Sequence, residues 1–319
     1  MSTPFSLPSF AKVNLSLRIL GKRPDGYHEI RTVLQTVSLH DTIQFAPNEG
    51  SEIFLTCDEP LVPTDRHNLI VKSAHALKDR FGIDAGARID LEKRIPMQSG
   101  LGGGSSNAAI ALLGLVQLWE LKTNIAELTE IAAALGADVP FFLSGGRALA
   151  TGTGTTISPL EDAAQQDLLL VSPNAKISTS EAYKALQAPA LTTSNSDFIL
   201  AVSRTEVNSA DSDLTVLRDD LVNDFERTIF DMEPEIGRAK EALLQAGARD
   251  ALLAGSGSSV FGIFGSRREQ ERGLVEFRAE SGWRTFSCET VTREEYSQAI
   301  SFGGTQLLRS FDLRIDTGA

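Results

Sequence analysis

The stretch Lys93–Ala109 reads KRIPMQSGLGGGSSNAA, a glycine-rich run that passes directly into a helical pattern. Apolar residues then recur at i, i+3, i+4 and i+7, namely at Ala109, Leu112, Leu113 and Val116. Ser105, Ser106 and Asn107 offer side-chain acceptors that begin helices, so we expect the helix to start there. Glycines before a helix start let an anion approach the exposed N–H groups and the positive end of the helix dipole. The stretch therefore predicts a phosphate-binding loop.

Two familiar phosphate motifs do not fit this loop. No Lys-Ser or Lys-Thr pair follows the last glycine, which excludes the Walker pattern. Ser105 takes the final small position of the dinucleotide fingerprint, and no acidic residue follows at the proper distance after a second strand. A nicotinamide-dependent oxidoreductase is therefore a distant interpretation. The remaining alternative is a flexible glycine hinge before a core helix.

Composition sets outer limits on function. The chain has 319 residues, enough for two domains, with 42% hydrophobic and 23% charged residues. Its net charge of -12 argues against binding to nucleic acid or to a membrane surface. The two cysteines, Cys57 and Cys288, have no metal-ligand spacing, and the N-terminus lacks a secretory pattern. We expect a cytoplasmic protein, as a monomer or weak homodimer.

Outward from the loop, the residue patterns predict alternating strands and helices. Strands are expected over 10–20, 32–45, 87–91 and 260–264, and helices over 68–81, 125–135 and 234–246. Gly136 stands where a left-handed helix cap is wanted. The chain turns polar and acidic after residue 159 and a new strand begins at Leu168, so we expect domains over 1–160 and 161–319. The polar stretch 190–213 is expected to be a mobile excursion.

Three positions outside the loop have a chemical interpretation beside a bland one. Asp138 follows a helix end and precedes an apolar run, so it is either a turn residue or a carboxylate that takes a hydroxyl proton. Lys12 lies in an apolar strand, where a lysine either snorkels or pairs with a carboxylate and a phosphate. Tyr27 and His28 follow the turn signal GKRPDG and could stack on and hydrogen-bond a base.

Several of these segments together resemble the GHMP small-molecule kinases. The resemblance covers nearly the full length, with lesser matches at Ile177–Tyr183 and Asn223–Glu226. The main matching segments are Ala11–Leu15 (AKVNL), Gly21–Ile30 (GKRPDGYHEI), His40–Ile43 (HDTI), Lys93–Ala109, Leu135–Gly146 (LGADVPFFLSGG) and Leu253–Phe264 (LAGSGSSVFGIF).

The resemblance implies an α+β fold and an ATP-dependent kinase that uses magnesium (Mg2+). The first domain would be a ribosomal-protein-like α+β domain, and the second an antiparallel sheet with helices, with the substrates in the cleft between them. Lys12 and Asp138 would be the catalytic pair, and Ser106 could be a magnesium ligand. The ATP-binding positions would be Asn68, Leu69, Pro96, Met97, Gln98, Ser99, Gly100, Leu101, Gly102, Gly103, Gly104, Ser105 and Ser106. The substrate-binding positions would be Asn14, Tyr27, His28, Thr179 and Tyr183.

The acceptor is suggested by Asp25–His28 (DGYH), an element that resembles the branch acting on a cytidine diphosphate derivative of methylerythritol. That branch phosphorylates a hydroxyl, at the 2-position, in non-mevalonate isoprenoid synthesis. Tyr27 and Tyr183 would stack on the cytosine and His28 would read its polar edge. Two alternatives stay open: a GHMP kinase for mevalonate, homoserine or a sugar, and a non-catalytic nucleotide-binding protein. Gln98 and Ser99 depart from the family, which often has glycine or alanine there.

Overall fold

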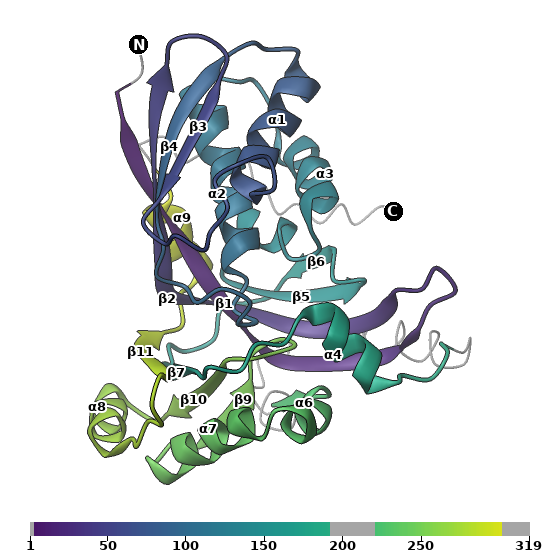
Figure 1. Cartoon of the computed structure of the whole chain (residues 1–319), viewed down its shortest axis with the longest axis vertical. Helices are drawn as coiled ribbons and strands as arrows, with labels where there is room; N and C mark the ends of the chain where they lie inside the picture. The colour runs from purple at the N-terminus through teal and green to yellow at the C-terminus, as the bar shows by residue number, and fades with distance from the viewer. Residues whose placement is uncertain (1–2, 192–220, 302–319) are drawn as a thin grey trace, which may run out of the picture.

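The computed structural model describes residues 3–191 and 221–301, and two sheets organise them (Figure 1). Most of the predicted excursion, residues 192–213, lies outside this part of the chain. The larger sheet has seven strands in the order β3-β4-β2-β1-β8, with β5 pairing to β2 and β6 to β5. Their bounds are β1 Phe5–Lys22, β2 His28–Asn48, β3 Ile53–Cys57, β4 Gly86–Glu92, β5 Arg147–Gly152, β6 Thr156–Pro159 and β8 Val222–Asn223.

Two unusually long strands, β1 and β2, lie at the centre of the larger sheet. They pair antiparallel over nearly their whole length. The second half of β2 pairs with β4, whereas its first half pairs with β5. The pairing of β1 with β2 shifts register at Phe10/Ala11, at Asn14/Ser16 and at Ile19/Gly21. Such irregularities re-aim side chains, and two of them flank the segment that carries Lys12 and Asn14.

Two helices pack on the larger sheet, and a third packs on those two and completes the core. They are α1 (Leu69–Phe81), α2 (Gly103–Leu118) and α3 (Ile125–Leu135), and a short 3-10 helix η1 (Pro140–Leu143) follows them. Helix α2 lies innermost, between the sheet and α1 (Figure 1). Every residue from Ala108 to Leu113 is at most 1% exposed. The phosphate-loop stretch is therefore fixed at one end to a helix that cannot move without opening the core.

The smaller sheet is antiparallel throughout, in the order β11-β7-β10-β9. Its strands are β7 (Asp167–Ser172), β9 (Asp250–Leu253), β10 (Val260–Phe264) and β11 (Arg284–Glu289). The helices around it are α4 (Thr179–Leu186), α6 (Glu226–Met232), α7 (Pro234–Gln245) and α8 (Arg267–Glu276). An apolar face of α7, with Ile236, Ala239 and Leu243, is fully buried. These two sheets with their helices confirm the predicted α+β class.

The last described helix, α9 (Arg293–Ala299), returns to the first core. Tyr296 is 0% exposed in that core, and its hydroxyl donates to the carbonyl of Phe142. The boundary predicted at residue 161 falls between β6 and β7. Where the two domains divide stays a prediction, because β8 pairs with β1 and α9 packs on the opposite side of that boundary.

Two details of the predicted helices were wrong. Helix α2 starts at Gly103, because Gly102 adopts a φ of 71° as the N-cap residue and no side chain caps the helix. Ser106 and Asn107 instead lie inside α2 and bond to Ser9 on β1. Gly136 does end α3, but its φ of 170° is extended and not left-handed. Its carbonyl accepts from the Val139 N–H, in the turn that leads into η1.

Gly114 on α2 allows the helix to approach the sheet closely, and we expect Gly114→Ala to destabilise the protein by about 1–3 kcal/mol. An added Cβ would lie 2.5 Å from the ring of Phe45, which is itself 0% exposed and stacks on Phe5. This overpacking outweighs the helix propensity that alanine gains, about 1 kcal/mol. The measurement is the free energy of unfolding in urea.

Gly237→Ala on α7 is the matched control. A Cβ there would meet Phe230 at 3.5 Å, an ordinary contact, so we expect a gain of up to about 1 kcal/mol. A Gly114→Ala protein as stable as the parent would show that α2 can shift away from β2.

Candidate active site

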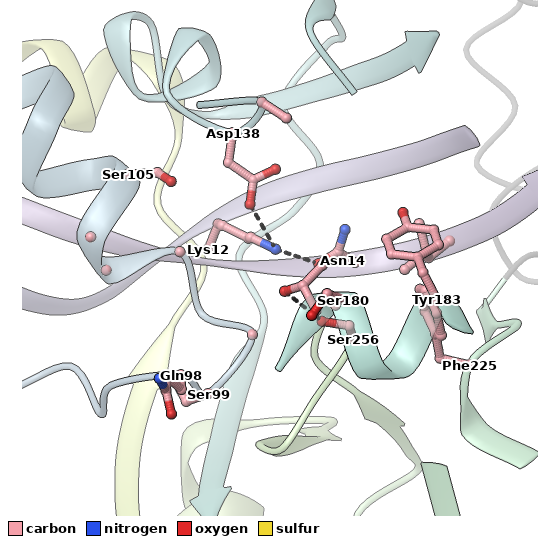
Figure 2. A pocket seen from close by; sticks show the side chains of 18 of the residues that line it. Lys12, Asn14, Gln98, Ser99, Ser105, Asp138, Ser180, Tyr183, Phe225 and Ser256 are labelled. Atoms are coloured by element: carbon pink, nitrogen blue, oxygen red, sulfur yellow. Dashed lines mark hydrogen bonds and ion pairs between the residues drawn. The ribbon is translucent and has the colours of Figure 1, made fainter. Parts of the chain in front are cut away.

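A cavity of about 1400 Å³ opens between the two sheets. Its walls come from β1, β2, the glycine-rich loop, the turn before η1, α4 and the loop after β9 (Figure 2). All the site residues expected from the sequence line it, except Leu101 and Ser106. The structure thus brings together positions that are up to about 170 residues apart in the sequence, between Lys12 and Tyr183. One end is rich in glycine and the other in aromatic rings.

A lysine and an aspartate face each other in the middle of the cavity. Lys12 Nζ lies 3.5 Å from Asp138 Oδ2 and donates to Asn14 Oδ1 at 2.8 Å (Figure 2). The side chain of Lys12 is 5% exposed, whereas that of Asp138 is 38% exposed. The backbone fixes this lysine to the loop, because the Lys12 N–H donates to the carbonyl of Leu101. The result is a carboxylate open to the cavity with a cation held behind it.

The glycine-rich loop is locked between the two domains and is not a free hinge. Gly100 has a φ of 78°, and a Cβ on it would lie 1.9 Å from the carbonyl oxygen of Ala254. The carbonyl of Ser99 accepts from the Ser259 N–H at 3.0 Å. Gln98, one of the family departures, has a φ of 52°. A residue with a Cβ costs about 1–2 kcal/mol in that conformation, which explains why glycine suits the position.

A buried aspartate that the sequence did not single out anchors this loop. Asp41 on β2 is 0% exposed. It accepts from Lys93 Nζ at 2.6 Å, from the N–H groups of Arg94 and Ile95 at 2.7 and 2.8 Å, and from Asn107 Nδ2 at 2.9 Å. One carboxylate therefore ties together a strand, the start of the loop and helix α2. The sequence signal for it was its place inside the matching segment His40–Ile43, which assigned it no role.

Ser106 does not fit the role of a magnesium ligand. It is 0% exposed and its hydroxyl accepts from Ser9 Oγ at 2.8 Å, so it is turned toward β1. Leu101 likewise points into the core and contributes only its carbonyl. The neighbouring Ser105 lines the cavity on the side of Asp138 (Figure 2). Its hydroxyl and that carboxylate are oxygen donors of the kind magnesium takes.

No cage of protein ligands for a metal ion is seen in residues 3–191 and 221–301, where no three His, Cys, Asp or Glu side chains cluster suitably. Magnesium that also binds phosphates and water needs only one or two protein oxygens. The Ser105 hydroxyl and the Asp138 carboxylate on the cavity wall fit such an ion.

The edge of the cavity near α1 is held by a helix cap. Asn68 caps α1, because its Oδ1 accepts from the Ile70 N–H at 2.8 Å while its Nδ2 donates to the carbonyl of Pro63 at 2.7 Å. Leu69 beside it lines the cavity and packs against the core. Asn68 therefore shapes this edge while both ends of its amide are engaged within the protein.

The opposite end of the cavity is aromatic. The rings of His28 and Tyr183 stack with centroids 4.6 Å apart, and Phe225 meets Tyr183 edge-on at 4.9 Å. Tyr27 is 66% exposed at the rim. Phe225, which the sequence did not suggest, thus backs the ring of Tyr183. Thr179 on α4 accepts from Ser256 Oγ at 3.2 Å, which joins this end to the loop after β9.

Two titratable groups at this end are held neutral. Burial raises the pKa of Tyr183 to about 12, and the nearby charge of Asp138 adds to the effect. Burial also lowers the pKa of His28, and the cation of Lys22 lowers it further. At neutral pH His28 therefore carries one ring donor and one ring acceptor, which suits the edge of an uncharged base.

We expect Lys22→Gln to raise the pKa of His28. The substitution removes the cationic contribution, which disfavours imidazolium, and leaves the larger effect of burial in place. The pKa should therefore move toward 6.5 without reaching it, and an NMR titration of the imidazole protons measures the change.

Lys184→Gln is the control, because that lysine also lines the cavity but does not perturb His28. An unchanged His28 pKa in Lys22→Gln, or an equal rise in both variants, would contradict the assignment.

Two domain families match the chain. The GHMP kinases N terminal domain matches residues 68–146, and the GHMP kinases C terminal domain matches residues 206–281. The fold resembles a crystal structure of 4-(cytidine 5'-diphospho)-2C-methyl-D-erythritol kinase, with a TM-score of 0.72 and 30% identity, over 90% of this chain and 99% of that one. Together the fold, the cavity and these matches define a GHMP kinase, a small-molecule kinase.

Curated relatives narrow the family. A protein of Chlorobium phaeobacteroides is 42% identical over 86% of this chain and 93% of its own length. One from Pelotomaculum thermopropionicum is 41% identical over 79% of this chain and 86% of its own. Both are named 4-diphosphocytidyl-2-C-methyl-D-erythritol kinase. The chain belongs to that family within the GHMP kinases, which confirms the resemblance seen in the motifs. Within the described residues, no helix is long and apolar enough to span a bilayer.

Proposed function

We propose that this chain transfers the γ-phosphoryl group of ATP to the 2-hydroxyl of 4-diphosphocytidyl-2-C-methyl-D-erythritol, a step of isoprenoid precursor synthesis. One observation carries the proposal: a single cavity holds the Lys12–Asp138 pair between a glycine-rich helix start and a stacked aromatic end. Each part suits one portion of the two substrates, in the order that the transfer needs.

The glycine-rich end suits the phosphates of ATP. Gly102, Gly103, Gly104 and Ser105 line the cavity at the start of α2, where backbone N–H groups lack partners inside the helix. A Cβ at Gly103 would lie 3.0 Å from the Ile95 side chain and 3.1 Å from Lys93 Nζ, so a larger residue there would crowd the segment that precedes the loop. The ammonium of Lys93 is already committed to Asp41, which leaves phosphate contact to the backbone and to Lys12.

Asp138 and Lys12 would act on the acceptor hydroxyl. The open carboxylate can accept or orient the hydroxyl proton, while the Lys12 ammonium pairs with it at 3.5 Å and keeps it in place. The same ammonium offsets charge that develops on the transferred group. Magnesium carried with the nucleotide would neutralise phosphate charge, and Ser105 and Asp138, whose oxygens line the cavity, would be the residues that hold it. Catalysis then rests on positioning, as loose phosphoryl-transfer transition states require.

The aromatic end suits the cytosine of the acceptor. Tyr27 at the rim and Tyr183 in the wall offer faces for stacking, and neutral His28 offers a donor and an acceptor. In the structure the His28 ring covers one face of Tyr183, so a base enters either on the Tyr27 side or after His28 turns. A kinase for homoserine, mevalonate or a simple sugar has no use for these rings.

The acceptor can be tested directly by coupling ADP release to a spectrophotometric assay. We expect kcat/KM with the cytidine substrate to exceed that with 2-C-methyl-D-erythritol 4-phosphate by at least about fivefold, because base stacking contributes about 1–3 kcal/mol. Homoserine, mevalonate and galactose, at matched concentration, serve as controls and should give no turnover. Equal rates with and without the cytidine portion would refute the role of the aromatic end.

Replacing the open carboxylate tests the catalytic assignment. Asp138→Asn keeps the shape of the side chain and removes its charge, so we expect kcat to fall by about 10²–10⁴-fold while the KM for ATP changes little. Asp84→Asn is the control, because the Asp84 side chain is 86% exposed and lies outside the cavity. Near-normal turnover in a folded Asp138→Asn protein would exclude the proposed role.

A further inference from the structure

A chain of buried hydrogen bonds runs behind the ammonium of Lys12. Lys12 Nζ donates to Asn14 Oδ1 at 2.8 Å, Asn14 Nδ2 donates to Thr32 Oγ1 at 2.7 Å, and Thr32 Oγ1 donates to the carbonyl of Ser16 at 2.6 Å. All four residues are at most 4% exposed. Asn14 and Thr32 come from different strands, β1 and β2.

The groups at the two ends of this series of hydrogen bonds determine which atom donates and which accepts in each bond. An ammonium can only donate, and a backbone carbonyl can only accept. The single proton of the Thr32 hydroxyl goes to Ser16, so the hydroxyl oxygen is left to accept the Asn14 amide N–H. The Asn14 carbonyl oxygen must then face Lys12. With its amide reversed, Asn14 would present N–H groups to an ammonium and leave Thr32 without its second bond.

The surroundings hold the Lys12–Asn14 contact from other sides. The register of β1 and β2 shifts between Asn14 and Ser16, which lets both residues reach the same Thr32. Gly255 approaches from the second domain so closely that a Cβ on it would lie 3.3 Å from Lys12 Nζ and 3.4 Å from Asn14 Oδ1. Beyond Asn14, the polar group that the structure places near the ammonium is Asp138, at 3.5 Å.

We infer that Thr32 is a positioning residue of the kinase reaction. Its hydroxyl sets the orientation of the Asn14 amide, and the amide oxygen holds the Lys12 ammonium beside Asp138. This inference rests on the proposed function, because it assigns the hydrogen-bond chain to the lysine that acts in phosphoryl transfer. Asn14 was expected from the sequence to contact the acceptor substrate. In this inference it also holds Lys12 through a hydrogen bond within the protein. Thr32 also lines the cavity, but both hydrogen bonds of its hydroxyl go to Asn14 and Ser16, so in this assignment it contributes to the rate through these neighbours.

The test compares Thr32→Val with Thr32→Ser. Valine keeps the shape and removes the hydroxyl, so we expect kcat to fall by about tenfold to a hundredfold, the effect of one hydrogen bond within a charged network. The KM for ATP should stay within about twofold, because the loop backbone is untouched. Serine restores the hydroxyl and should recover most of kcat.

Thr36→Val is the matched control on the same strand. Thr36 is 0% exposed, it pairs with Lys12 in the β1–β2 register, and its hydroxyl has no hydrogen-bond partner among the residues that the structure describes. The same exchange of hydroxyl for methyl should therefore leave kcat within about twofold. Thermal unfolding of all variants shows whether each is folded. Should Thr32→Val fail to fold, Thr32→Ala gives the same comparison with a smaller side chain.

Three results would overturn the inference: full kcat in Thr32→Val, equal losses in Thr32→Val and Thr32→Ser, or an equal loss in Thr36→Val. The wild-type enzyme is assayed first. If it does not phosphorylate the cytidine acceptor, the proposed function is contradicted, and not the role of Thr32. Crystal structures of the substrate-free variants then test the inference independently of activity. In Thr32→Val the Lys12–Asp138 separation should change, whereas in Thr36→Val and Thr32→Ser it should stay near 3.5 Å.

Discussion

The carboxylate of Asp41 holds the architecture of the site together. An ion taken out of water costs several kcal/mol unless other groups satisfy it, and this one meets an ammonium, two backbone N–H groups and an amide. Those donors come from the start of the glycine-rich loop and from α2. The loop can therefore close in only one way that satisfies the charge. Its glycines then face the cavity and its carbonyl at Leu101 reaches Lys12.

The cavity separates two kinds of chemistry by charge. Around Lys12 and Asp138 the side chains are ionic or strongly polar, and nearly all their bonds stay inside the protein. At the other end burial favours the neutral forms of Tyr183 and His28, with the cation of Lys22 close enough to lower the pKa of His28 further. The cation in the middle of the cavity is Lys12, and its position on β1 places it beside Asp138.

Sequence patterns were a good guide where the physics is local. Helical spacing located α1, α3 and α7, because one face of each must be buried. The start of α2 was misplaced because it depends on the backbone φ angle of Gly102. No side chain caps the helix, so no residue type in the sequence indicated that start. Lys12 and Asp138 stood out by their apolar surroundings in the sequence, and the motif resemblance made them a catalytic pair. Asp41 and Thr32 could not be predicted, because their roles depend on the pairing and register of segments far apart in the sequence.

The return of α9 to the first core has a consequence for how the protein is made. Tyr296 fills a space against Phe10 and Phe142, at the foot of the helices that carry the glycine-rich loop. During synthesis this space stays open until nearly three hundred residues have left the ribosome. The core formed by the first half of the chain is therefore completed only when α9 has been synthesised. A fragment ending after β6 would lack Tyr296 and would expose an apolar gap in the first core.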